Sequence, residues 1–268
     1  MKLFFEDRED DYAIADKALA RFRDSKRFSS SKDYRPKYKG LSDDEYKELK
    51  KKSLPDSATD EERAAYYNYI DNSSDVLEAV LRIVDKLGLE VEGLDARIKE
   101  GDSYLRKAQR RKSATIEDCV RFSIICTNQN LVKAYHAVDS ELKSAGYKEH
   151  MVENNFTDDS IALNNLAVYY EKNGALFEIW FHTNETITAL HKAHKYYEVV
   201  RSYDRDDPEE LAAILRVLDD MFRTSKPDGI ESIKSTGTYL HEDFEEDEMP
   251  YDIDATLDVI KRAWRAIH

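Results

Sequence analysis

Basic side chains are concentrated in one short segment of an otherwise acidic chain. Four cations and one hydroxyl lie within eleven residues: Arg97, Lys99, Ser103, Arg106 and Lys107. The Gly-Asp-Ser at 101–103 is typical of a helix start. Backbone N–H groups at a helix N-terminus attract anions, and guanidinium groups bind phosphate oxygens in pairs. The segment therefore predicts a site for a compact polyanion such as a nucleotide triphosphate. Taken alone, it also fits a solvated basic helix face.

An acidic residue and an arginine precede the first strand-like segment. Asp118 is three residues before Arg121, and the apolar run Phe122–Cys126 is typical of a buried strand. A carboxylate at the end of a strand is well placed to hold Mg²⁺ against substrate phosphates. An aspartate in this position is also typical of a helix or strand cap, so its spacing alone leaves both interpretations open.

A second acidic residue lies within an alternating segment, Phe-Glu-Ile-Trp-Phe-His-Thr at 177–183. In a strand, this alternation places Glu178, Trp180 and His182 on one face, and the apolar residues between them on the other. A buried glutamate without a partner is costly. A metal ion or a substrate hydroxyl would supply the partner for Glu178. An exposed sheet face is the alternative.

Helices dominate the part of the chain before these residues. Apolar residues at helical spacing predict helices at 10–23, from Ser42 to about Lys52, from Thr59 to Ile70, and from 72–74 to Leu87. The segment Ser25–Tyr38 has no sustained period and is typical of a linker. This part is therefore expected to be a polar helical extension.

The pattern changes to strands and helices after residue 120. Strands are predicted at Phe122–Cys126, His150–Phe156, Ile161–Tyr170 and Ala175–Phe181. Asn-Gly at 173–174 between the last two predicts a hairpin, because both residues tolerate positive φ. Helices are predicted at 131–145, 183–201, 208–222 and 253–267. We expect an α+β fold with a mixed sheet of about five strands flanked by helices.

Three parts are predicted along the chain. Residues 1–72 form the helical N-terminal extension, 73–205 form the core with the candidate site, and 206–268 form a helical C-terminal segment with an acidic loop at 241–254.

Composition limits the classes of function. The chain of 268 residues has 41% hydrophobic and 36% charged residues and a formal net charge of −14. That charge argues against a broad nucleic-acid-coating face, although a local basic pocket remains compatible with it. No apolar run approaches the ~18 residues of a membrane span, and the first residues turn acidic too early for a secretory signal. We expect a cytoplasmic protein with no membrane partner. A delivered effector or a virion-associated protein would have the same sequence features.

Taken in order, these segments resemble the synthetase fold of RelA/SpoT-like nucleotidyltransferases. That family carries an Arg-x-Lys-x-x-x-Ser-x-x-x-Lys stretch, which matches residues 97–107 here. An acidic residue and an arginine at a strand follow, as at 118 and 121. A Glu-Ile-Gln-[Ile/Phe]-[Arg/His]-Thr strand comes next, as at 178–183, and then a helix with spaced histidines and aromatics, as at 191–197. The likeness spans roughly residues 75–202. It is nearest to the divergent variants found in phage or prophage head-region proteins and toxin modules.

The resemblance implies a role for each matched residue. The ATP phosphates would be held by Arg97, Lys99, Ser103, Arg106 and Lys107, and His182 would also contact phosphate. The implied catalytic residues are Glu178, Asp118 and Arg121. Of these, Asp118 and Glu178 would bind Mg²⁺, Glu178 would help to activate the attacking hydroxyl, and Arg121 would steady the phosphate charge.

The implied activity is Mg²⁺-dependent transfer of pyrophosphate from ATP to a ribose hydroxyl of a nucleotide, as in alarmone synthetases and toxins. Two alternatives stay open: a catalytically inactive phage or prophage structural or binding protein, and a tRNA 3′-end pyrophosphokinase toxin. An antitoxin or a phage structural protein would then be the partner. The stretch Asp159–Asn165 lacks the Gly-Tyr segment that usually contacts the acceptor base in this family, which favours the inactive alternative. Trp180 replaces the family's usual glutamine.

Overall fold

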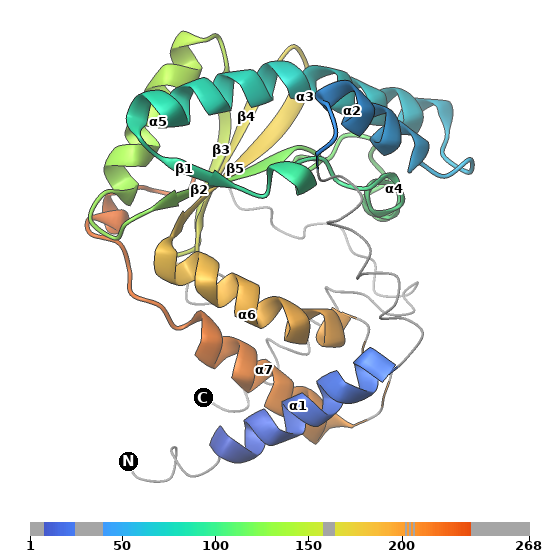
Figure 1. The fold of residues 1–268 in the computed structure, drawn as a ribbon, viewed down its shortest axis with the longest axis vertical. Coiled ribbons are helices and arrows are strands. Elements are labelled where there is room, and N and C mark those ends of the chain that lie inside the picture. Colours follow the sequence, from blue (N-terminus) through green and yellow to red (C-terminus); the bar gives the residue numbers. More distant parts are fainter. Residues whose placement is uncertain are drawn as a thin grey trace.

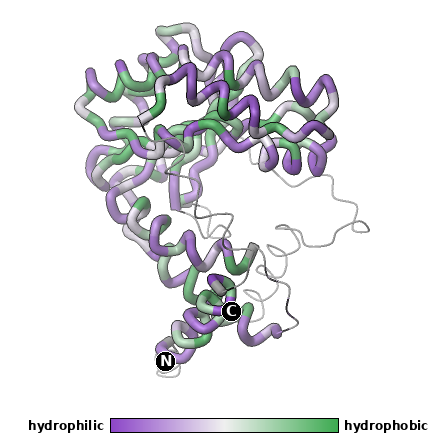
Figure 2. Tube along the Cα trace, turned by 45° about the vertical axis from the view of Figure 1, so that its right-hand side comes forward, coloured by the Kyte–Doolittle hydropathy of each residue, from purple (hydrophilic) through white to green (hydrophobic). Residues whose placement is uncertain are grey.

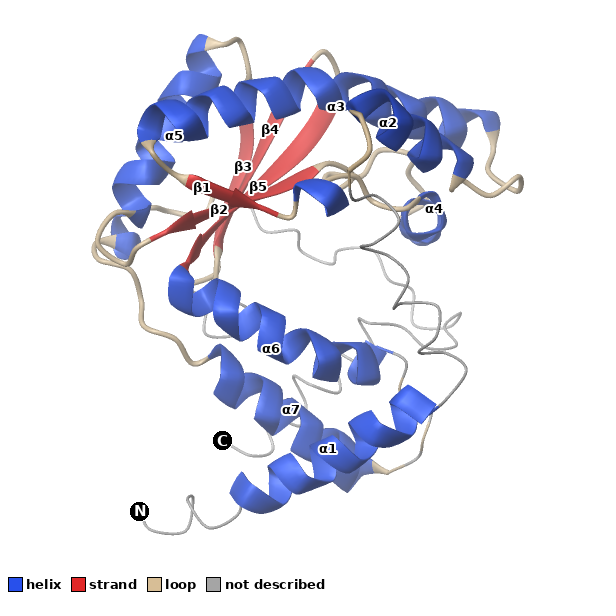
Figure 3. Ribbon diagram, viewed as in Figure 1, coloured by secondary structure: helices blue, strands red, loops and turns tan. Residues whose placement is uncertain are grey.

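The computed structural model describes residues 8–24, 40–157, 164–201, 203, 205 and 207–236. These residues form an α+β fold around one mixed five-stranded sheet with the strand order β1-β2-β5-β4-β3. The strands are β1 (Glu90–Glu92), β2 (Arg121–Cys126), β3 (Lys148–Asn154), β4 (Leu166–Lys172) and β5 (Ala175–Thr183). Helices lie on both faces of this sheet (Figure 3). The predicted fold class is confirmed, and β1 is a strand that the sequence patterns did not indicate.

The central strand β5 determines where the site lies. It pairs in parallel with β2 and antiparallel with β4, while β1 and β3 pair antiparallel at the two edges. The turn between β4 and β5 has φ 57° at Asn173 and φ 76° at Gly174, so the predicted Asn-Gly hairpin is confirmed. Because β5 is flanked on both sides, eight of its nine residues are buried.

Two helices cover one face of the sheet, α3 (Asp60–Leu87) and α5 (Leu131–Ser144) (Figure 1). A capping box formed by Thr59 and Glu62 begins α3, and Gly88 ends it in the left-handed region at φ 63°. The sequence predicted two helices with a break at 72–74, and this prediction is wrong. The buried Ser73 hydroxyl donates to the Ile70 carbonyl at 2.6 Å, and the Ser74 hydroxyl donates to Asp43. These side chains therefore have partners that leave the backbone of the helix intact.

Helices α2 (Asp43–Lys52) and α4 (Gly101–Arg110) lie beside one end of α3 (Figure 1). Tyr46, Leu54, Tyr66 and Tyr69 share a single hydrophobic core with the sheet. The boundary predicted at residues 72 and 73 falls within α3, and both halves of that helix contribute to this core. Short 3₁₀ turns at Leu94–Ala96 and Ile230–Ser232 complete the described elements.

A second helical layer lies below the other face of the sheet. It consists of α6 (Asn184–Arg201), α7 (Pro208–Phe222) and α1 (Arg8–Asp24). These helices enclose a separate apolar cluster that includes Ala15, Leu19, Tyr196, Ile214 and Val217. The hydrophobic stretches of the chain gather in these two places (Figure 2). The helix α6 continues directly from β5 and joins the two layers.

Several predicted segments lie outside the described residues. They are the linker at 25–38, the first residues of the strand predicted from Ile161, the acidic stretch at 241–254 and the helix predicted at 253–267. In the parts of the chain that are described, no helix is both long and apolar enough to cross a membrane.

Candidate functional site

Strands β2 and β5 bring the predicted acidic residues into one region. Arg121 is the register partner of Glu178, and the Glu178 N–H donates to the Val120 carbonyl at 2.9 Å. The Arg121 Nη1 atom is 3.9 Å from the Glu178 Oε2 atom. Asp118 lies just before β2, and its negative charge is one of the causes that raise the pKa of Glu178. The two carboxylates are therefore electrostatic neighbours on the same part of the sheet.

Two lysines converge on Asp118. Lys99 Nζ lies 2.9 Å from Oδ2, and Lys107 Nζ lies 2.9 Å from Oδ1. Burial acts to raise the pKa of Asp118, but the two ammonium charges outweigh it and hold this pKa well below its usual range. Burial lowers the pKa of Lys107, and the charge of Asp118 opposes that shift. All three side chains keep partial exposure, between 17% and 23%, so a ligand in solvent can reach them.

The two lysines reach Asp118 from different elements. Lys99 lies on an extended stretch that bridges to β2: Ile98 pairs with Val120, and the Lys99 N–H donates to the Cys119 carbonyl at 2.8 Å. Lys107 comes from α4, which begins directly after that stretch. Cys119 is a buried free thiol. Two lysines that are separated in the sequence, Lys99 and Lys107, therefore pair with a single carboxylate.

Glu178 is buried on the face of β5 that is turned away from α3 and α5, with 2% of its surface exposed. Its Oε1 atom accepts a hydrogen bond from the Trp180 Nε1–H, and the Arg121 guanidinium lies 4.1 Å from the centre of the Trp180 ring. Burial raises the pKa of Glu178, while the charge of Arg121, the hydrogen bond from Trp180 and the nearby Tyr169 hydroxyl act to lower it. The net direction is upward, so this carboxylate binds a proton more readily than an ordinary glutamate.

A divalent cation fits the chemistry of Glu178. Its Oε2 atom is buried and has no hydrogen-bond partner among the described residues. No group of three or more histidine, cysteine or acidic side chains in the described ranges forms a metal site by itself. A Mg²⁺ ion at Glu178 and Asp118 would take its remaining ligands from phosphate oxygens and water, as this ion usually does.

Arg97 lies against a different partner from the other predicted phosphate ligands. Its guanidinium is ion-paired with Asp43, lies 4.0 Å from the Tyr46 ring centre and donates to the Leu94 carbonyl at 2.8 Å. Only 7% of Arg97 is exposed. The phosphate contact implied for it stays a prediction, and its observed contacts are with α2.

Ser103 and Arg106 lie on the first two turns of α4 and are accessible to solvent. Arg106 donates to the Ser103 hydroxyl at 3.0 Å and pairs with Asp102 at 3.0 Å. With 60% of its side chain exposed, Arg106 can reorient toward a ligand at little cost. Their phosphate roles also remain predictions.

His182 is completely buried, on the same face of β5 as Glu178. Its Nδ1 atom is 3.2 Å from the Thr186 hydroxyl of α6, and its Nε2 atom has no partner among the described residues. Burial, followed by the charges of Arg121 and His191, lowers the pKa of His182 to about 3. The ring is therefore neutral at pH 7 and would meet a phosphate as a neutral imidazole.

Sequence reasoning missed two residues beside Glu178. Tyr169 is its register partner on β4, and the Tyr169 hydroxyl donates to Glu153 at 3.0 Å. The position of Tyr169 beside Glu178 could have been predicted from the Asn-Gly turn, because counting back from a two-residue hairpin pairs residue 169 with residue 178. Glu153 lies on the edge strand β3, and no pattern in the sequence pointed to it.

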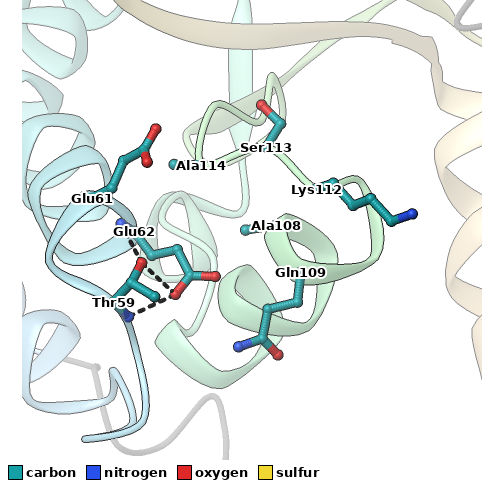
Figure 4. A pocket seen from close by; sticks show the side chains of 8 residues that line it. All are labelled: Thr59, Glu61, Glu62, Ala108, Gln109, Lys112, Ser113 and Ala114. Carbon is teal, nitrogen blue, oxygen red and sulfur yellow. Dashed lines mark hydrogen bonds between the residues drawn. The ribbon is translucent and has the colours of Figure 1, made fainter.

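One cavity of about 190 Å³ lies between the start of α3 and the end of α4 (Figure 4). Its lining includes Thr59, Glu62, Gln109 and Lys112. Thr59 and Glu62 bond to each other in the capping box, as the dashed lines in Figure 4 show. None of the predicted site residues lines this cavity, so it is separate from the Asp118–Glu178 region.

Two solved structures are similar to the chain in fold. A GTP pyrophosphokinase family protein from Streptococcus pneumoniae matches with a TM-score of 0.42 and 17% identity, over 58% of this chain and 82% of that chain. The small alarmone synthetase 1 from Bacillus subtilis, bound to its product pppGpp, matches with a TM-score of 0.41 and 16% identity, over 59% of this chain and 88% of that chain.

No protein-family model and no curated protein sequence matches the chain. At the identities found, the structural likeness concerns the fold, and the activity has to be argued from the residues themselves.

Proposed function

We propose that this chain is a Mg²⁺-dependent pyrophosphokinase that uses ATP as the donor. The observation that carries the proposal is the convergence of Lys99 and Lys107 on Asp118, beside the pairing of Arg121 with Glu178. Cations and carboxylates are both required around a triphosphate–magnesium complex, and few other ligands require them together.

In the proposed reaction, a ribose hydroxyl oxygen attacks the β-phosphorus of ATP. A new O–P bond forms, the bond from the β-phosphorus to the oxygen bridging it to the α-phosphorus breaks, and AMP leaves. Glu178 accepts the hydroxyl proton, for which its raised pKa is suitable. Arg121 steadies the charge on the transferred phosphates. Bound Mg²⁺ would neutralise phosphate charge and orient the leaving group.

The two lysines would change partners when ATP binds. In the structure both ammonium groups pair with Asp118. Phosphate oxygens would compete for these ammonium groups, and Asp118 would then be available to hold the cation that accompanies the nucleotide.

The test is AMP release from labelled ATP in the presence of Mg²⁺ and a panel of guanine nucleotides, adenine nucleotides and tRNA. We expect AMP with at least one acceptor, and loss of at least ~100-fold in rate for Glu178→Gln, because the base is removed. Glu171→Gln, on the same hairpin, is the matched control and keeps the activity. If no acceptor gives AMP above the Glu178→Gln level, the enzymatic proposal is wrong.

The second candidate is a protein that binds nucleotide without turnover. The stretch Asp159–Asn165, which has neither glycine nor tyrosine, favours it. It predicts that a non-hydrolysable ATP analogue binds with Mg²⁺ while no acceptor yields AMP. AMP release only with tRNA would instead favour the toxin alternative.

A further inference from the structure

The stretch from Arg97 to Gly101 has backbone hydrogen bonds to side chains from α2 and α3. The Ile98 N–H donates to the Tyr46 hydroxyl at 3.1 Å, and the Tyr66 hydroxyl donates to the Lys99 carbonyl at 2.7 Å. Both tyrosines are buried, with at most 2% of their surface exposed. Because a buried backbone group has no water to bond instead, each tyrosine hydroxyl fixes the position of one peptide of the stretch.

The end of the stretch is fixed by close packing. The Gly101 N–H donates to the Ser53 hydroxyl at 2.8 Å. A Cβ atom at Gly101 would lie 2.4 Å from the Cα and N atoms of Leu54. Only glycine allows the first residue of α4 to approach the backbone after α2 so closely.

Two ion pairs join the same stretch to α2. Asp43 pairs with Arg97, and Lys50 Nζ lies 2.6 Å from Glu100 Oε1. The Lys50–Glu100 pair is buried, with side-chain exposures of 1% and 6%. Buried pairs of this kind add little net stability over apolar residues, but breaking one partner is costly and so they define a geometry. All five residues from Arg97 to Gly101 are therefore contacted from the segment Asp43–Tyr66.

We propose that α2 and the residues after it are a positioning element for the phosphate site. They set the path of residues 97–101, and thereby where Lys99 and the helix carrying Lys107 meet Asp118. This inference rests on the proposed function, since it assigns to α2 the placement of the proposed phosphate ligands. It also gives α2, which was expected to be part of a polar extension, an indirect role in the site.

The physical reason is the precision that a phosphate site requires. Displacements of about 1 Å in a positioned catalytic group reduce rates strongly. A flexible lysine side chain does not by itself place its ammonium group with that precision. A backbone that is fixed at residues 98, 99 and 101 limits the positions that the Lys99 ammonium group can take. The positioning residues act through Lys99 and α4 and need not touch the nucleotide.

The experiment compares Tyr46→Phe and Tyr66→Phe with the matched control Tyr170→Phe. Each change removes one buried tyrosine hydroxyl and keeps the ring; Tyr170 lies on β4 on the opposite face from Glu178 and bonds to Asp139. Affinity for a non-hydrolysable ATP analogue with Mg²⁺ is measured by calorimetry. Amide exchange at Ile98 is measured by NMR, and unfolding is followed in the same samples.

We expect a loss of affinity of about 5- to 10-fold in each of the two test variants, which corresponds to one hydrogen bond. The control is expected to keep its affinity within about twofold at a similar loss of Tm. Exchange at Ile98 rises in Tyr46→Phe and stays unchanged in Tyr170→Phe. In steady-state assays the KM for ATP rises more than kcat falls, since phosphate binding precedes chemistry.

The outcomes separate the two proposals. A wild-type protein that binds no ATP analogue overturns the proposed function, and this inference with it. A wild type that binds the analogue, with test variants that bind equally well, overturns the positioning role alone. Equal losses in all three variants would also overturn it, because the effect would then be a general loss of stability.

Discussion

At the scale of single residues, the site is defined by two carboxylates in opposite electrostatic states. Asp118 is ion-paired with two lysines, so its pKa is lowered, whereas Glu178 is so deeply buried that burial outweighs the charge of Arg121 and its pKa is raised. Environments that separate two carboxylate pKa values in this way assign them different tasks. Asp118 is suited to remain charged beside metal and phosphate, and Glu178 to exchange a proton.

Trp180 tunes the proton affinity of Glu178. Its Nε1–H bonds to the carboxylate and lowers the Glu178 pKa. The change Trp180→Phe removes this donor but keeps a ring beneath Arg121. The Glu178 pKa should then rise further, and the acid limb of the pH profile of kcat/KM should shift to higher pH. An acid limb that coincides with that of the wild type would contradict this role.

His182 makes stability depend on pH. Its pKa is lowered to about 3 in the folded state from an ordinary 6.5, so the unfolded chain binds the proton more readily. The folded state is thus favoured above pH 6.5, and this contribution is lost as the pH falls from 6.5 toward 3, by up to about 1.4 kcal/mol per unit.

The variant His182→Asn should have a shallower decline of the free energy of unfolding across this window, measured by urea denaturation at several pH values. The exposed His150, changed to Asn, is the control and should keep the wild-type slope. Equal slopes for His182→Asn and wild type would show that this ring does not carry the effect.

At the scale of elements, α2 and α4 are tied by a buried ion pair. The change Lys50→Met removes the ammonium group that lies 2.6 Å from the buried Glu100 carboxylate and should cost about 3–5 kcal/mol of unfolding free energy. The double change Lys50→Met with Glu100→Met replaces both charges by apolar side chains of similar volume. It should recover most of that loss, as measured by urea denaturation.

The cost of the single change should itself depend on pH. Burial, followed by the charge of Asp102, raises the pKa of Glu100 to about 7. Without the Lys50 ammonium group, Glu100 can accept a proton at pH 6, so Lys50→Met should be less destabilising there than at pH 8. A double variant that is no more stable than the single one at pH 8 would mean that the ion pair is not the main contact between these elements.

At the scale of the whole molecule, the two larger apolar clusters of the described residues lie in layers that α6 joins. The cluster between α1, α6 and α7 depends on α1, whose Asp11 pairs with Arg216 of α7 in two contacts of 2.7 and 2.6 Å. Removal of residues 1–24 would expose the apolar faces of α6 and α7 to water. We expect amide exchange to rise in α6 and α7, while the amides of β2, β4 and β5 keep their protection.

Uniform loss of protection over both layers would mean instead that the molecule unfolds as one cooperative unit.

The roles suggested by the sequence for the molecule as a whole, as a toxin with an antitoxin or as a phage-associated protein with a structural partner, remain predictions. Identifying which acceptors yield AMP would distinguish between these roles.

The order of elements after residue 120, the Asn-Gly hairpin and the alternation along β5 were determined by the sequence alone. Each depends on windows of a few residues, in which periodicity and turn chemistry act locally. The same local information placed Glu178, Trp180 and His182 on one face. Local patterns failed at residues 72–74, where a hydrogen bond within α3 satisfies the Ser73 hydroxyl.

Only the tertiary structure decided which charges meet. The segment that begins at Arg97 contains four cations within eleven residues, yet two of them reach Asp118 while Arg97 pairs with Asp43, more than fifty residues away. Partner choice across such separations depends on how α2, α4 and β2 pack together, and no short window contains that information. The same packing buries Lys50 of α2 against Glu100, beside the stretch that carries Lys99.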